Sequence, residues 1–124
     1  MFRNWEEFAL GPRDPREDLH VTLNEKGEIM IGARAAEMFG PHDWVVLLYD
    51  KWNGCIGIAP IKERSENAFP IVNKIKGRHR VIRAGRFCRY YGIFIPRTTA
   101  CKAELDADGT LVLDLKATRA VRKG

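Results

Sequence analysis

The sequence predicts a single, mainly β domain of the α+β class, a barrel made of two repeats that each carry one short helix. Its 124 residues, 45% hydrophobic and 30% charged, are typical of one globular domain of modest size. Residues 27–40 match residues 79–92 at an offset of 52, which pairs Arg34 with Arg86. A repeat of this length predicts two copies of one supersecondary unit.

The first repeat, residues 19–62, predicts two strands, a helix and two further strands. Apolar residues at helical spacing, followed by Gly40, predict a short helix. Asn53 and Gly54 predict a tight hairpin, because such residues readily take a positive φ. We expect strands and helix in this order: strands 20–23 and 28–31 around a turn at 24–27, helix 33–39, strands 44–49 and 55–59.

The second repeat, residues 69–116, predicts the same order of elements. Gly92 stands where Gly40 ends the first helix, and Asp108 and Gly109 predict the second hairpin. We expect strands 69–75 and 79–83 around a turn at 76–78, helix 84–91, and strands 100–105 and 110–115. Two such short helices cannot cover a sheet, so we expect the copies to interleave into one closed barrel with approximate twofold symmetry.

Three segments lie outside the repeats. Residues 1–18 form an N-terminal extension, in which residues 2–10 are expected to make a turn or two of amphipathic helix. Residues 63–68 read as a polar linker, and residues 117–124 as a frayed basic tail.

The charges divide sharply between the halves of the chain. Residues 1–66 hold 8 Lys and Arg against 12 Asp and Glu, whereas residues 67–124 hold 13 against 4. From Lys74 to Lys102 there are nine cations and no anion. An ordinary surface mixes its signs, so this segment predicts an anionic partner, of which nucleic acid is the commonest.

The candidate nucleic-acid-binding residues are the cations of the second repeat's hairpin, strand and helix. We expect Lys74, Lys76, Arg78 and Arg80 to hold phosphates, and Arg83, Arg86 and Arg89 to lie nearest the groove. The alternative is that these arginines pair within the molecule with acidic residues of the first repeat, such as Glu25, Glu28 and Glu37.

Other chemistry has weak signals in this sequence. The three histidines lack metal spacing, no nucleophile motif occurs, and we predict no enzyme activity, metal or cofactor. Cys55, Cys88 and Cys101 are expected to be reduced core side chains.

The aromatic residues Trp44, Tyr90 and Tyr91 are expected in the core or packed on turns, whereas an exposed Trp52 at a hairpin tip would indicate a contact surface. With no apolar run of membrane length and no signal-peptide pattern, we expect no membrane contact and a cytoplasmic location.

Residues 21–31, the short helix ending at Phe39 and Gly40, and the run 45–50 resemble the swapped-hairpin barrel half of the AbrB and MraZ families of bacterial DNA-binding regulators. The duplication within one chain is similar to MraZ. The resemblance covers residues 19–60 and, more faintly, 69–115. It implies a pseudo-twofold, double-psi-like barrel that binds DNA with arginines around its second strand and helix. The family's Gly-Arg dipeptide at the hairpin is Gly27-Glu28 here.

These observations together predict a transcriptional regulator that binds duplex DNA through the second repeat. Two alternatives stay open: a protein-interaction or assembly module of the same fold that docks on an acidic protein, and RNA binding. Self-association of the chain is also left open.

Overall fold

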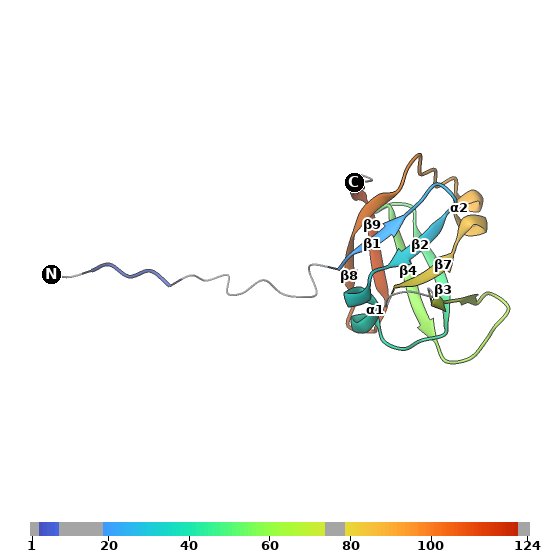
Figure 1. Cartoon of the computed structure of the whole chain (residues 1–124), viewed down its shortest axis with the longest axis horizontal. Coiled ribbons are helices and arrows are strands. Elements are labelled where there is room, and N and C mark those ends of the chain that lie inside the picture. Colours follow the sequence, from blue (N-terminus) through green and yellow to red (C-terminus); the bar gives the residue numbers. More distant parts are fainter. Residues whose placement is uncertain (1–2, 8–18, 74–78, 122–124) are drawn as a thin grey trace.

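The computed structural model describes residues 3–7, 19–73 and 79–121. Nine strands and two short helices are found in these residues (Figure 1). In chain order they are β1 (Val21–Leu23), β2 (Glu28–Ile31), α1 (Ala33–Phe39), β3 (Trp44–Asp50), β4 (Cys55–Ile61), β5 (Phe69–Pro70), β6 (Val72–Asn73), β7 (Arg80–Arg83), α2 (Gly85–Tyr91), β8 (Thr99–Leu105) and β9 (Leu111–Ala120).

The described strands form one antiparallel sheet in the order β5-β3-β4-β9-β8-β1-β2-β7-β6. Its two end strands, β5 and β6, are separated in the chain only by Ile71, so the sheet curls into a nearly closed barrel. Ile71 donates its backbone N–H to the carbonyl of Asp43 at 2.9 Å, which helps to hold this corner. A mainly β barrel with two short helices is therefore confirmed.

The two halves of the chain alternate around the barrel. β2 pairs with β7, β4 with β9, β1 with β8, and β3 with β5, and each of these pairs joins a strand of the first half to one of the second. The strands β2 and β7, like the helices α1 and α2, begin and end 52 residues apart, as the sequence repeat predicts.

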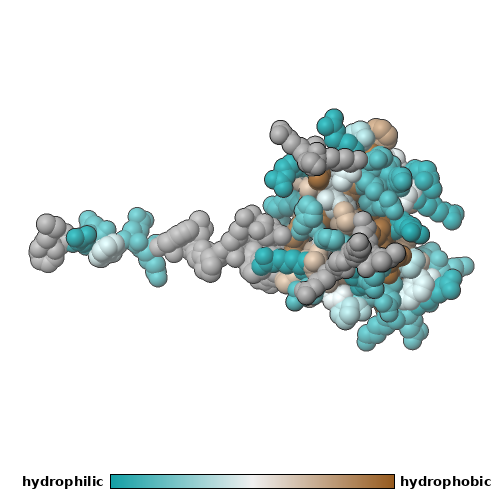
Figure 2. All heavy atoms as spheres, in the orientation of Figure 1, coloured by the Kyte–Doolittle hydropathy of each residue, from teal (hydrophilic) through white to brown (hydrophobic). Residues whose placement is uncertain are grey.

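The core is aliphatic and draws on both halves. The largest side chains that are fully buried are Leu23, Ile29, Ile31, Ile56, Ile58, Ile82, Leu111 and Leu113. Alternation along β2, where Ile29 and Ile31 are buried and Glu28 and Met30 are half-buried, is what a strand facing a core requires. Figure 2 shows hydrophilic side chains over most of the visible outer surface, with small hydrophobic areas between them.

Three expectations about the ends of elements were wrong in part. β9 continues to Ala120 instead of fraying after residue 116, because residues 118–120 pair with Thr99–Cys101 beyond a bulge at Cys101 and Lys102. The strand expected at 69–75 is divided at Ile71, where the chain changes its partner from β3 to β7. Residues 3–7 form neither helix nor strand; the remainder of the expected helix at 2–10 lies outside the described residues.

Candidate nucleic-acid interface

Four of the seven predicted binding residues lie in the described part of the chain. Arg80 and Arg83 begin and end β7, and Arg86 and Arg89 lie on α2. Arg83 ends the strand, as the expected range 79–83 has it. Lys74, Lys76 and Arg78 lie outside the described residues.

The helix α2 forms where its apolar and polar residues separate onto two sides. Phe87 and Cys88 are buried, whereas Arg86, Arg89 and Tyr90 are exposed. Gly92 ends the helix in the left-handed conformation, with φ of 66°, and its N–H points to the carbonyls of Cys88 and Arg89. A cation in the last turn also suits the negative end of the helix dipole, which favours Arg89 at this place.

The position of α2 is fixed by the β1–β2 turn. Ala84 donates its backbone N–H to the carbonyl of Gly27 at 2.9 Å. A Cβ atom on Gly27 would come within 2.6 Å of the Cα of Gly85, so the two backbones are in direct contact. The β1–β2 turn of the first half thus fixes α2, the helix of the second half that carries Arg86 and Arg89.

We call Arg83, Arg86 and Arg89 the arginine face. All three side chains are exposed, and in the described part of the chain none lies within 4.0 Å of a carboxylate. Glu28 is opposite Arg83 in the strand register, yet its carboxylate accepts a hydrogen bond from Asn24 at 3.0 Å. The expected pairing of these arginines with Glu25, Glu28 and Glu37 is thus not observed among the described residues.

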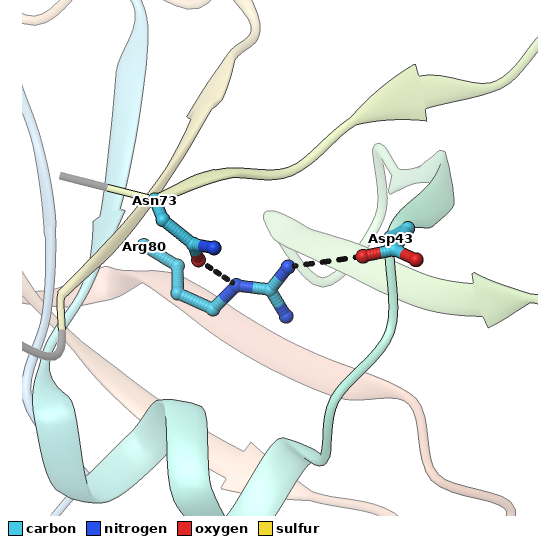
Figure 3. A network of polar contacts seen from close by, with 3 residues as sticks. All are labelled: Asp43, Asn73 and Arg80. Atoms are coloured by element: carbon cyan, nitrogen blue, oxygen red, sulfur yellow. Dashed lines mark hydrogen bonds and ion pairs between the residues drawn. The ribbon is translucent and has the colours of Figure 1, made fainter.

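Arg80 has a different environment from the arginine face (Figure 3). Its side chain is only 12% exposed; its Nε donates to Oδ1 of Asn73 at 2.9 Å, and one terminal nitrogen lies 3.8 Å from Oδ1 of Asp43. It lines a cavity of about 480 Å³ together with α1 residues that include Ala36 and Glu37. Arg80 therefore contacts its own protein, and its guanidinium is less accessible to a large partner than those of the arginine face.

The matching helix α1 carries a different charge pattern. Arg34 stands at the position equivalent to Arg86, but Glu37 stands where α2 has Arg89. Both α1 side chains are exposed. The two helices lie on opposite sides of the barrel in Figure 1, so the charge patterns of α1 and α2 belong to different parts of the surface.

An aromatic cluster leads from the core to the surface beside the arginine face. Tyr91 packs against Tyr49 with ring centroids 4.8 Å apart and against Phe87 at 5.1 Å, and Tyr90 meets Tyr91 edge to face at 4.8 Å. Tyr90 itself is 81% exposed, so the expectation that it is a core or turn-packing residue was wrong. The helical period alone did not predict this, because at about 100° per residue Tyr90 lies about 160° from Cys88 but only about 60° from Phe87.

Two aromatic residues of the barrel outside α2 are also exposed. Phe94, just after α2, is 82% exposed, and sequence reasoning missed it. Trp52, at the β3–β4 turn, is 92% exposed, as a contact residue at a hairpin tip would be.

The cysteines are consistent with structural thiols. Cys88 and Cys101 are buried and Cys55 is half-buried. Burial raises the pKa of Cys88, and burial together with the negative charge of Asp114 raises the pKa of Cys101 to about 11. Because nucleophilic cysteines have a lowered pKa, the arrangement gives Cys88 no activation despite its arginine neighbours.

Comparison of the chain with protein-family models, curated proteins and solved structures finds no match. The resemblance to the AbrB and MraZ families therefore stays a prediction. In the ranges described, no three His, Cys, Asp or Glu side chains are grouped as metal ligands. No helix found there has the length and apolar character needed to cross a membrane.

Proposed function

We propose that this protein binds DNA through the arginine face, as a regulator of transcription would. The observation that carries the proposal is the exposure of Arg83, Arg86 and Arg89, at the end of β7 and on the helix that follows it, without a carboxylate within 4.0 Å in the described residues. Like charges held together repel each other in the free protein, and a polyanion removes that repulsion.

Arginine is suited to both kinds of contact that DNA offers. Its planar guanidinium can donate two parallel hydrogen bonds to a phosphate or to the edge of a guanine. The neighbouring segment from Lys74 to Lys102 adds no negative charge that would repel the phosphates. We infer, further, that the barrel is of the swapped-hairpin, double-psi-like type, which the alternation of the two halves supports.

The test is titration of a fluorescent duplex DNA of random sequence at several salt concentrations. We expect a slope of log affinity against log salt of about −0.9 for each phosphate neutralised, and thus about −4 to −5 for five contacts. Arg86→Ala and Arg89→Ala should each cost about 1–3 kcal/mol if the residue contacts a base, and less if it contacts phosphate alone.

Arg34→Ala is the matched control, because Arg34 occupies the equivalent exposed position on α1. We expect it to leave the affinity unchanged. Loss of binding in this variant, with Arg86→Ala unaffected, would place the site on the first repeat. Absence of binding at low salt, or affinity indifferent to salt, would favour the protein-interaction module instead.

A further inference from the structure

Two exposed aromatic rings stand next to the arginine face. Tyr90 is 81% and Phe94 82% exposed, although a large apolar ring left in water forgoes the free energy that its burial would release. Tyr90 follows Arg89 in α2, and Phe94 lines the same small cavity as Arg89 and Gly85. Phe94 therefore lies beside Arg89, and Tyr90 is the next exposed residue of the same helix.

The ring of Tyr90 is supported from the core. Its edge-to-face contact with Tyr91 has an interplanar angle of 83°, and Tyr91 is packed in turn against Phe87 and Tyr49. Such a chain of contacts restricts the rotamers of Tyr90 before any partner binds, which lowers the entropy lost on binding.

Phe94 is held by the end of α2. Gly92 reverses the chain in the left-handed conformation, and the N–H of Ile93 then donates to the carbonyl of Cys88 at 2.8 Å. Phe94 directly follows this hydrogen bond, so the backbone that carries its ring is anchored to the helix.

We propose that the arginine face binds DNA whose bases are unpaired, with Tyr90 and Phe94 stacking on the bases. This inference rests on the proposed DNA binding and names its substrate class. In an intact duplex the faces of the bases are covered by their neighbours, so exposed rings have nothing to stack on. In a single strand each base presents a π-face, and the adjacent arginines meet the phosphates.

The positive charge favours this occupant over an uncharged apolar one. Arg86 and Arg89 lie on the same helix as Tyr90, and no acidic residue occurs between residues 67 and 103. The cavity that Arg89 and Phe94 share is also lined by one acid and one lysine of the β1–β2 turn, Glu25 and Lys26. A membrane surface would also attract these charges, but interfacial helices present a broad apolar side to the lipid, whereas α2 has seven residues and directs its apolar side into the core.

The experiment measures binding of a labelled 20-nucleotide single strand, of the same strand in duplex, and of a duplex with a short single-stranded gap. Wild type should bind the single strand and the gapped duplex about fivefold or more tighter than the intact duplex. Tyr90→Ala and Phe94→Ala should each weaken binding to the single strand by about 5- to 100-fold and change duplex binding less than twofold. Tyr90→Phe should retain the affinity of wild type, because it keeps the ring.

Trp5→Ala is the matched control, since Trp5 is an aromatic residue of similar exposure, 84%, that belongs to no strand or helix of the barrel. It should change neither affinity, and thermal unfolding of each variant checks that the fold is kept. If the duplex binds and Tyr90→Ala and Phe94→Ala bind the single strand as wild type does, the stacking inference is overturned while the proposed DNA binding stands. If no DNA binds, both fail. Binding to anionic lipid vesicles that Phe94→Ala abolishes, without DNA binding, would assign the rings to a membrane surface.

Discussion

The arginines of β7 and α2 lie in different environments. Arg80 is largely buried and hydrogen-bonded to Asn73, whereas Arg86 is exposed. From the sequence we expected Arg80 to hold a phosphate of a partner. Asn73 faces Arg80 across the expected hairpin, whereas Asp43 is brought to it by the fold, so no local pattern reveals that both groups hold the guanidinium.

Arg80→Ala is expected to lower the free energy of unfolding by about 1–2 kcal/mol, because it removes a hydrogen bond and the packing of the side-chain stem. The ion pair with Asp43 should contribute little, since Asp43 is 85% exposed. Arg86→Ala should shift stability by about 0.5 kcal/mol or less. Urea unfolding of the two variants checks this, and equal losses would contradict the structural role of Arg80.

The Cys101 thiol is expected to make stability depend on alkaline pH. Its pKa in the folded chain is about 11, above the ordinary value of 9.0, because burial disfavours the thiolate. The folded state then binds more protons than the unfolded state between pH 9 and 11, so stability should fall as the pH rises through this window. Urea unfolding at pH 8, 9 and 10 should show a steeper decline for wild type than for Cys101→Ala; parallel declines would refute the assignment.

At the scale of elements, the β1–β2 turn contacts α2 through two glycines, Gly27 of the turn and Gly85 of the helix. Gly27 has a φ of 78°, and a Cβ there would collide with the backbone of Gly85. Gly92 has a similar φ of 66°, but a Cβ there meets nothing within 4 Å. The two positions therefore separate backbone strain from crowding.

We expect Gly27→Ala to destabilise the protein by about 2–4 kcal/mol, because strain and overpacking act together. Gly92→Ala should cost about 1 kcal/mol, from strain alone. The difference between their midpoints of urea unfolding measures the crowding, and the same cost at both positions would mean that the turn moves freely away from α2.

The elements themselves could largely be predicted from the sequence. α1 spans the expected residues 33–39, and α2 begins one residue later than expected, because periodicity and the glycines Gly40 and Gly92 mark such helices locally. The extension of β9 to Ala120 could not be predicted, since it depends on pairing with Thr99–Cys101 across a bulge. The exposed ring of Phe94 was missed because it follows the helix, where no period applies.

On the scale of the whole molecule, each half of the chain completes the sheet of the other. Four strand pairings, β1 with β8, β2 with β7, β3 with β5, and β4 with β9, connect the halves. The core residues Ile29 and Ile82 are direct partners in one of these pairings. A half by itself would leave these strand edges and apolar side chains exposed.

Fragments 1–65 and 66–124 are accordingly expected to be unfolded or self-associated when made separately, and to form the barrel when mixed. Circular dichroism and sedimentation of each fragment and of the mixture test this. Two stable folded monomers would show that the halves are independent domains.

A barrel of two identical chains would present the same helix twice and would suit a partner with matching symmetry. Here α1 presents Arg34 and Glu37 where α2 presents Arg86 and Arg89. The two related helices thus present different charges, which a symmetric pair of identical chains could not do. A nucleic-acid strand bound at α2 would contact one such surface in each protein molecule. Each binding site on the strand would then hold one protein molecule, in a single orientation relative to the direction of the strand.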